Sequence, residues 1–338
     1  MREPEFWYRP PSLMSLLLGP LGTLYGMITG RRMLRAGFDA GIPVFCIGNY
    51  HLGGAGKTSL VLALSKLLRD LGETPIVLSR GYGGKLRGPI LVDPVVHEAV
   101  DVGDEPLMLA GTVPVVVSRD RVDGVALARA RNASAILMDD GFQNPAIAKD
   151  ASLIVIDAGR GIGNGKVFPA GPLRAPLRPQ LARTDALIVI GDGSAAIAVA
   201  DAVAAHGKPV LSAQIRPHQM SLAALRGERV LAFAGIGDPA RFFRTLRDSG
   251  IEVVRERAFP DHYPFSKHDI AGLIAEAKRD SLRLVTTEKD KVRLRNVEAA
   301  KQIVQFAITL EFEEPSRLRA FVADRLFQAR AKKFRAGS

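Results

Sequence analysis

Cysteine is almost absent from this sequence, since Cys46 is the only one among 338 residues. An intrachain disulfide is therefore impossible, and metal sites built from several cysteine ligands are excluded. A chain without disulfides suits a reducing compartment. Cys46 lies in the apolar run at residues 44–47, where we expect it to be a small buried hydrophobic side chain.

Aromatic residues are also scarce, at 6% of the chain, and no basic run is interleaved with them. Proteins that bind single-stranded nucleic acid stack bases on such side chains, so we expect no nucleic-acid partner. The charge is nevertheless unbalanced, with 46 Lys and Arg against 35 Asp and Glu, which gives a formal net charge of +11. Charge alone would fit a nucleic acid, a nucleotide or an anionic lipid, so the choice depends on motifs.

A stretch that could span a membrane is missing near the amino terminus. Residues 13–29 carry no charge, but as a helix they would reach about 25 Å, short of a hydrocarbon core of roughly 30 Å. Pro20 and several glycines weaken a spanning helix further. Glu3 and Glu5 precede the stretch and its basic residues follow it, which does not fit a cleavable signal peptide.

Drawn as a helix, this stretch has two different faces, one aliphatic and one made of small residues. The aliphatic face carries Leu13, Leu17, Leu21, Leu24 and Ile28, and the small face carries Ser15, Gly19, Gly22 and Gly26. Trp7 and Tyr8, residue types that favour a membrane interface, precede it, and three arginines follow within residues 31–35. We interpret residues 1–36 as an amphipathic segment that lies on a membrane surface, with a helix buried against the main domain as the alternative.

From residue 42 onward, short apolar runs alternate with amphipathic stretches. Near-continuous β-branched runs alternating with helices predict an α/β protein with a mostly parallel sheet and helices on both faces. The expected strands lie at 44–48, 76–79, 113–118, 135–139, 153–157, 186–190 and 210–213, with helices at 59–71 and 121–133 between them.

A second series of elements begins near residue 230 and predicts a smaller α/β domain. Strands are expected at 230–234, 252–257, 283–287 and 302–308, and helices at 239–249, 267–278 and 315–332. Pro217 and a break in periodicity mark the connection between the two series. We therefore predict a main domain at 37–214, a connection at 215–229, and a smaller domain with a C-terminal helix at 230–338.

The strongest local motif is the glycine-rich sequence GNYHLGGAGKT at 48–58, placed between a predicted strand and a predicted helix. Backbone N–H groups at a helix amino end bind anions, and glycines let phosphate oxygens approach closely. His51 occupies the first glycine position of the strict phosphate-loop pattern, so the motif is its Gly-Gly-x-Gly-Lys-Thr variant. We predict a P-loop NTPase-like nucleotide site. Its expected cofactor-binding residues are Asn49, Gly53, Gly54, Ala55, Gly56, Lys57 and Thr58.

A phosphate loop also needs acids for Mg²⁺ and a group that activates the nucleophile. Asp139 and Asp140 end a predicted strand, at the sheet edge where ligands of open parallel sheets bind, although a solvated turn is the alternative. Asp104 and Glu105 precede a helical stretch and could simply cap it. His262, in a proline-bracketed loop, could help to remove a hydroxyl proton if a carboxylate pairs with it.

Several motifs in a common order make the sequence similar to the tetraacyldisaccharide 4′-kinase family, which makes lipid IVA in lipid A biosynthesis. The motifs are GNYHLGGAGKT at 48–58, SRGYGG at 79–84, GDEP at 103–106, DDGFQ at 139–143, GNG at 163–165, PAGPLR at 169–174, FPDHY at 259–263 and TTEKD at 286–290. The resemblance covers almost the full length. It implies a kinase that uses ATP and Mg²⁺ on an acylated glucosamine disaccharide 1-phosphate lipid, at the cytoplasmic face of the bacterial inner membrane.

The resemblance also implies roles for matching residues. Lys57 and Thr58 would bind phosphate and Mg²⁺, with Glu105 and Asp139 assisting at the metal. Asp104 would accept the proton of the sugar hydroxyl, oriented by His262, and domain closure would complete the site. The further active-site groups that the family implies are Asp140, Arg121 and Arg174.

The chain departs from the family pattern at a few positions. Ala55 and Ser59 replace an expected threonine and proline, and neither change removes a phosphate donor. Ala175 stands where the family usually has an acid after Arg174, so no carboxylate role can be assigned there. Two other functions share the phosphate loop: a membrane-associated switch ATPase acting on a protein partner, and a carboxylate-activating ligase. The first often has an extra lysine early in the loop, which is missing here.

Overall fold

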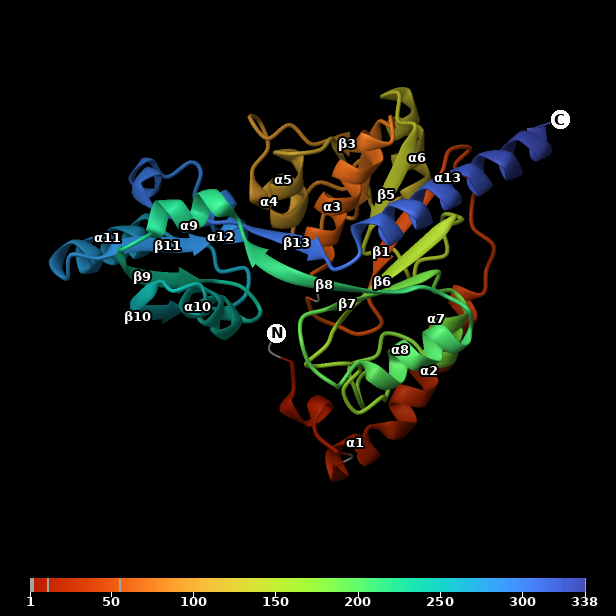
Figure 1. Ribbon diagram of the computed structural model, residues 1–338, viewed down its shortest axis with the longest axis horizontal. Helices are drawn as coiled ribbons and strands as arrows, with labels where there is room; N and C mark the ends of the chain where they lie inside the picture. The colour runs from red at the N-terminus through yellow and green to blue at the C-terminus, as the bar shows by residue number, and fades with distance from the viewer. Residues whose placement is uncertain (1–2, 11, 55, 338) are drawn as a thin grey trace.

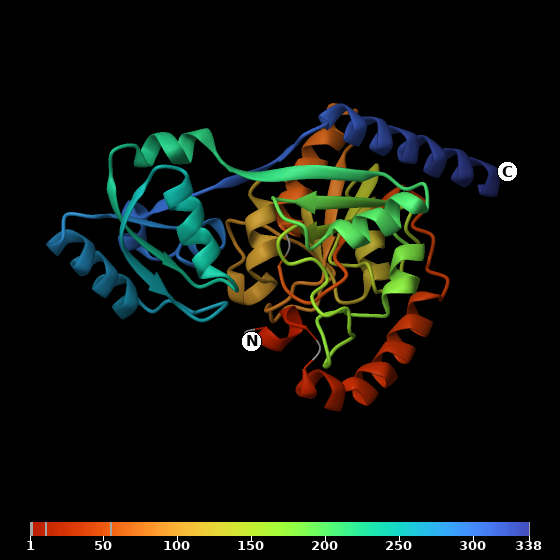
Figure 2. The ribbon, with the colours of Figure 1, turned by 60° about the horizontal axis from the view of Figure 1, so that its bottom comes forward.

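The structure is a computed structural model of the chain and describes residues 3–10, 12–54 and 56–337. It contains a nine-stranded sheet and a separate four-stranded sheet. The two sheets lie side by side along the longest axis of the molecule, and two long strands, β8 and β13, run from one toward the other (Figures 1 and 2).

The nine-stranded sheet has the order β13-β8-β7-β6-β1-β5-β2-β4-β3. Its inner pairs are all parallel, while β13 and β3 pair antiparallel at the two edges. This confirms the predicted mostly parallel sheet. The strands are β1 Val44–Gly48, β2 Pro75–Ser79, β3 Ile90–Leu91, β4 Val115–Val117, β5 Ala135–Asp139, β6 Ala151–Asp157, β7 Ala186–Ile190, β8 Val210–Pro217 and β13 Ile308–Phe312.

Helices cover both faces of this sheet because successive side chains of each strand point to opposite faces. In β1, Phe45 and Ile47 belong to one buried apolar cluster and Val44 and Cys46 to another. Helices α3 (Lys57–Asp70), α5 (Asp104–Ala110) and α13 (Pro315–Gly337) pack on the first cluster, and α6 (Arg121–Ala130), α7 (Leu177–Ala182) and α8 (Ile197–Ala205) pack on the second. A short helix, α4 (Ala99–Val102), precedes α5.

The four-stranded sheet is the centre of a second unit, and its strands are parallel in the order β10-β9-β11-β12. Helices α9 and α10 pack on the face that contains Val230 and Ala232, and α11 packs on the face that contains Leu231 and Phe233. The elements are α9 Gln219–Leu225, β9 Arg229–Ala234, α10 Pro239–Asp248, β10 Glu252–Ala258, α11 Lys267–Arg279, β11 Arg283–Thr287, α12 Glu288–Arg293, the 3₁₀ turn Glu298–Gln302 and β12 Val304–Phe306.

The structure differs from the sequence prediction where the two units join. The strand expected at 302–308 is two strands, because β12 ends in the smaller sheet and β13 then enters the larger one beside β8. Ala307 lies between them and exchanges hydrogen bonds with His218 and the Ser221 hydroxyl, which ties the crossing to α9. The domain boundaries at 215–229 and 230–338 stay a prediction, although β13 and α13 lie against the larger sheet.

The amino-terminal segment forms the 3₁₀ turn Glu5–Tyr8 and two helices, α1 (Leu13–Leu17) and α2 (Gly19–Met33), rather than one continuous helix. The break falls at Leu18, where Pro20 starts the second helix at one of its first positions. The small face of α2 is the buried one, since a Cβ on Gly22 would lie 2.7 Å from the Val167 carbonyl oxygen.

The aliphatic face of this segment is exposed, so the segment packs on the main domain by its small face but is not buried as a whole. Leu13 is 74% exposed, and the other four aliphatic residues of the predicted face are each more than half exposed. None of the helices in the described part of the chain is both long enough and apolar enough to cross a membrane.

Candidate active site

The glycine-rich loop joins β1 to α3, as the sequence predicts. Gly53 and Gly56 have φ angles of 98° and 87°, a left-handed conformation that favours glycine. The Lys57 ammonium is buried at the start of α3 and donates to the Gly53 carbonyl oxygen over 3.4 Å. Asn49 donates to the same oxygen over 2.9 Å, so its side chain holds the loop in shape.

The predicted cofactor-binding residues lie in this one loop wherever the structure describes them. Gly54 is exposed with no neighbouring atoms where a side chain would be, and Thr58 is half-buried in the first turn of α3. The Asn49 side-chain oxygen is buried without a partner among the described residues. Ala55 lies outside the described residues. The loop therefore presents backbone and side-chain groups to a ligand at a helix amino end.

Asp139 and Asp140 lie at the carboxyl end of β5, next to this loop. Asp139 is buried, and its Oδ1 atom has no hydrogen-bond partner among the described residues. Burial, followed by the charges of Glu105 and Asp140, raises the pKa of Asp139 to about 7. A buried acid with an unpaired oxygen among other acids is an arrangement that a cation would stabilise.

Asp140 lies between two cations, both predicted as site residues. Arg174 donates to its Oδ1 over 2.8 Å, and Lys57 lies 3.7 Å from the same atom. Burial favours the neutral acid, but these two cations outweigh it and lower the pKa of Asp140. Arg174 also donates to the His51 carbonyl oxygen over 3.0 Å, which links it to the loop. The next residue, Ala175, is fully buried in the apolar cluster on that side of the sheet.

Arg121 begins α6 and is 3% exposed, which is unusual for an arginine. Its Nη2 donates a long hydrogen bond of 3.5 Å to the Asp139 carbonyl oxygen. Two guanidinium nitrogens, Nε and Nη1, are buried without a partner among the described residues. Arg121 therefore offers unused donors beside Asp139, as an anion site requires.

The structure brings Asp104 and His262 together from the two units. His262 Nδ1 lies 2.7 Å from Asp104 Oδ2, although 158 residues separate them in the chain. The Asp104 hydrogen bond raises the pKa of His262, in spite of burial. Burial acts against ionisation of Asp104, but hydrogen bonds from His262 and Arg293 lower its pKa. The Tyr82 ring lies beside the imidazole, with 6.0 Å between centroids.

Two cations of α12 lie at the same site, and no role was predicted for either from the sequence. Lys289 forms an ion pair with Glu105, and Arg293 forms one with Asp104. Burial acts against ionisation of Glu105, but Lys289 and then Lys57 lower its pKa. Lys289 lies in the TTEKD motif, and Arg293 follows it four residues later. That spacing puts both on one helix face, but only the contact of α12 with α5 shows which acids they meet.

His51 replaces a glycine of the strict loop pattern. It is 2% exposed, and its Nδ1 atom has no partner among the described residues. Burial, with further contributions from Lys57 and Arg174, lowers the pKa of His51 to about 4, so the imidazole is neutral at physiological pH. It therefore adds a neutral polar group to the loop.

A phosphate loop, neighbouring acids, unpaired arginine donors and a carboxylate–imidazole pair are the parts of a site that transfers a phosphoryl group to a hydroxyl. The fold and the site together define a kinase of the P-loop class.

Comparison with known proteins gives the particular family. The sequence pattern of the Tetraacyldisaccharide-1-P 4'-kinase family, LpxK, matches residues 14–327. The chain belongs to this family.

Individual relatives agree along the whole chain. It is 65% identical over 335 residues to the tetraacyldisaccharide 4'-kinase of Bradyrhizobium diazoefficiens, covering 99% of each chain, and 63% identical to that of Nitrobacter hamburgensis, covering 98% of this chain and 100% of the relative. Among solved structures, the "apo" form of LpxK from Aquifex aeolicus in complex with ATP superposes with a TM-score of 0.74 and 26% identity, over 93% of this chain and 100% of that one.

Proposed function

We propose that this protein transfers the γ-phosphate of ATP to the 4′-hydroxyl of tetraacyldisaccharide 1-phosphate, giving lipid IVA. The observation that carries the proposal is the 2.7 Å contact between Asp104 and His262, which joins the two units at one site. A switch ATPase needs no group that accepts a proton from an acceptor alcohol, whereas a sugar kinase does. Family membership supports the same substrate.

The nucleotide part of the site is the Lys57 loop. In this proposal the backbone of Gly53, Gly54 and Gly56 surrounds the phosphates, and Lys57 balances their charge. Arg121 supplies its unpaired guanidinium nitrogens, and Arg174 contributes the guanidinium that donates to Asp140. These cations would stabilise the charge that spreads over the transferred group in the transition state.

The acids beside the loop fit a magnesium ion. Asp139 has a buried oxygen without a hydrogen-bond partner, and its pKa is raised by burial and then by Glu105. A divalent cation would pair with that oxygen and lower the pKa. The Thr58 hydroxyl, in the first turn of α3, is the third group that we assign to the ion. When bound, Mg²⁺ would neutralise phosphate charge and align the nucleotide.

Asp104 is the group that we assign as proton acceptor. It is held ionised by His262 and Arg293, so its carboxylate can take the hydroxyl proton as the phosphoryl group is transferred. His262 comes from a loop of the second unit, in a left-handed backbone conformation with φ of 58°. The contact between His262 and Asp104 joins the two units in this structure.

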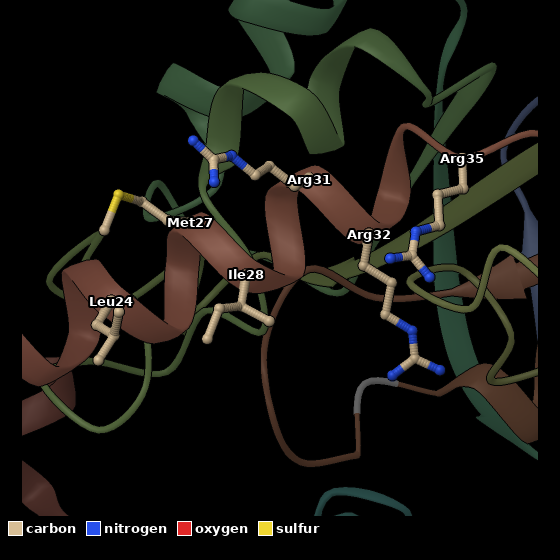
Figure 3. Close-up of a pocket in the computed structure, with 6 residues that line it drawn as sticks. All are labelled: Leu24, Met27, Ile28, Arg31, Arg32 and Arg35. Carbon is tan, nitrogen blue, oxygen red and sulfur yellow. The ribbon is translucent and has the colours of Figure 1, made fainter.

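We also propose that the amino-terminal segment rests on the membrane that holds the lipid substrate. Its aliphatic side chains are exposed, while its glycine face packs on the body of the protein. Figure 3 shows apolar side chains along α2, followed by arginines at its end. They surround a hollow of about 300 Å³ lined by Leu24, Met27, Ile28, Arg31, Arg32 and Arg35. Apolar side chains bordered by arginines suit an anionic lipid surface.

The test is transfer of radiolabel from γ-labelled ATP to acylated glucosamine disaccharide 1-phosphate in detergent micelles with Mg²⁺. We expect labelled bisphosphorylated lipid from the wild type and none above background from Lys57→Ala. ATP hydrolysis by the wild type without any labelled lipid would contradict the kinase and favour the switch ATPase.

A further inference from the structure

Helix α12 of the second unit faces the first turn of α5 with matched charges. Lys289 and Arg293 lie one helical turn apart on α12, and they meet the adjacent acids Glu105 and Asp104. The proposed function gives both acids a role, and it uses Arg293 only as a charge that keeps Asp104 ionised. Any further role of Arg293 therefore depends on the geometry of its contacts.

Arg293 makes the more extensive set of contacts of the two. Its Nε donates to Asp104 Oδ2 over 2.7 Å, and its Nη2 lies 2.5 Å from the same oxygen. Its Nη1 donates to Asp290 Oδ1 over 2.6 Å and to the Gly235 carbonyl oxygen over 2.9 Å. The side chain is only 7% exposed, so little water screens these contacts.

The groups that hold Arg293 are themselves fixed. Asp290 is fully buried and accepts hydrogen bonds from the Gly235 N–H over 3.0 Å and from the Thr287 hydroxyl over 2.7 Å. Gly235 follows β9, and its carbonyl oxygen also accepts the backbone N–H of His262 over 3.0 Å. One backbone position thus fixes both partners of Asp104 relative to the smaller sheet.

This arrangement leaves the two oxygens of Asp104 in different states. His262 and Arg293 both contact Oδ2, while no described residue donates a hydrogen bond to Oδ1. Two donors on one oxygen fix the plane of the carboxylate more firmly than either alone, and a planar guanidinium is suited to this task. The free oxygen is then the one that can receive the hydroxyl proton.

We propose that Arg293, anchored by Asp290, is a positioning residue that orients Asp104 so that Oδ1 faces the acceptor hydroxyl. The inference rests on the proposed function, because it takes Asp104 as the proton acceptor. Arg293 touches the carboxylate and not the reacting atoms, so its contribution passes entirely through Asp104. A small misplacement of a reacting group costs about 10²-fold in rate, which sets the size of the effect.

The experiment compares Arg293→Ala, Arg293→Lys and a control, Arg295→Ala, by lipid phosphorylation and by ATP affinity. The Arg295 guanidinium donates to the carbonyl oxygens of Pro94 and His97, so the control breaks a similar contact between the units without touching an acid. We expect Arg293→Ala to lower kcat about 10²-fold with the KM for ATP changed less than about threefold. Arg293→Lys should recover about tenfold, and Arg295→Ala should keep kcat within about threefold of the wild type.

A double variant decides whether Arg293 acts through Asp104. If it does, adding Arg293→Ala to Asp104→Ala lowers the rate no further than Asp104→Ala alone. A kcat for Arg293→Ala within about threefold of the wild type, or a further fall in the double variant, overturns the inference. If Arg293→Ala does not fold, the replacement variant is Asp290→Asn, which weakens the contact that holds Arg293 while keeping the size of the side chain. We expect this variant to lower kcat about tenfold. An unchanged kcat would equally overturn the inference.

These results are distinguishable from failure of the proposed function. If the wild type transfers no radiolabel to the lipid, the proposed kinase function is wrong, whatever the Arg293 variants do. If Asp104→Ala keeps the wild-type rate, the proton acceptor is wrongly assigned. If Asp104→Ala is inactive and Arg293→Ala is not impaired, the inference about Arg293 alone is wrong.

Discussion

The two sides of the site differ in how completely their polar groups are paired. On the side of the larger sheet, Asn49, His51, Arg121 and Asp139 each have a buried polar atom without a hydrogen-bond partner among the described residues. Among those residues the second unit has one such atom, Arg293 Nη2, and it still forms an ion pair with Asp104. On the side of the second unit, the three side chains that we place in the site each contact a carboxylate of α5. Those three side chains are His262, Lys289 and Arg293.

This difference indicates a division of work. Buried polar groups are normally hydrogen-bonded, so unpaired ones beside a phosphate loop are best explained by a ligand that satisfies them. The side chains of the second unit are already paired, and they orient the carboxylates of α5 that they contact. We therefore propose that the larger sheet supplies the surface that receives the nucleotide, and that the second unit positions the acids of α5.

The largest effect should follow from a substitution in the phosphate loop, on the side of the larger sheet. We expect Lys57→Ala to lower lipid phosphorylation at least about 10⁴-fold, because the loop loses the cation that balances phosphate charge. Lys66→Ala, at an exposed position on the same helix, is the control and should leave the rate unchanged. Equal rates for the two variants in the radiolabel assay would contradict the assignment of the loop.

The second-largest effect concerns Asp104, the carboxylate of α5 that pairs with His262 and Arg293 of the second unit. We expect Asp104→Ala to lower kcat about 10³-fold, since the acceptor hydroxyl loses its base. ATP affinity, measured by equilibrium binding, should change little because Asp104 does not belong to the loop. Near-wild-type turnover would remove Asp104 from the mechanism.

A smaller effect should appear in stability. The raised pKa of Asp139 means that the folded protein binds its proton more tightly than the unfolded chain, so stability falls as pH rises from about 4 to about 7. Asp139→Asn removes this cost. Without Mg²⁺, we expect the variant to be more stable than wild type by about 1–2 kcal/mol at pH 8, with the difference gone near pH 4.

Denaturant unfolding at the two pH values measures this difference. Asp70→Asn, at an exposed acid at the end of α3, is the matched control and should show no change at either pH. A wild type that is more stable than Asp139→Asn at pH 8 would contradict the raised pKa.

The smallest effect on the chemistry should come from the membrane segment. Leu24 on α2 and Ile197 on α8 are both 54% exposed, so they make a matched pair. We expect Leu24→Asp to weaken binding to vesicles containing anionic phospholipid about tenfold, and Ile197→Asp to leave it unchanged. Both should alter stability by less than about 0.5 kcal/mol. Equal vesicle binding in a sedimentation assay would count against α2 as the contact surface.

Local patterns predicted most of the fold. Strands such as Val44–Gly48 and Ala135–Asp139 match their expected bounds, because buried parallel strands are continuous apolar runs. The split of the 302–308 strand could not be predicted, since membership of a sheet depends on partners far away in the chain. For the same reason β13 was not expected beside β8.

In the site, too, contacts between residues far apart in the chain could not be predicted from local patterns. The glycine-rich loop and the acids after β5 follow from spacing within one segment, and the structure places them together. The pairing of Asp104 with His262 came only from the resemblance to a family, because 158 residues separate them. Arg293 was missed because an arginine in a short helix is ordinarily exposed, and only the contact of α12 with α5 gives it a role.

The most direct test of this division of work is a single-turnover measurement on His262→Ala, with ATP affinity measured on the same preparation. If the second unit positions and the larger sheet binds, the dissociation constant for ATP stays within about threefold of the wild type while phosphoryl transfer slows about 10²-fold. A loss of ATP affinity that accounts for the slower transfer, or transfer at the wild-type rate, would contradict the account.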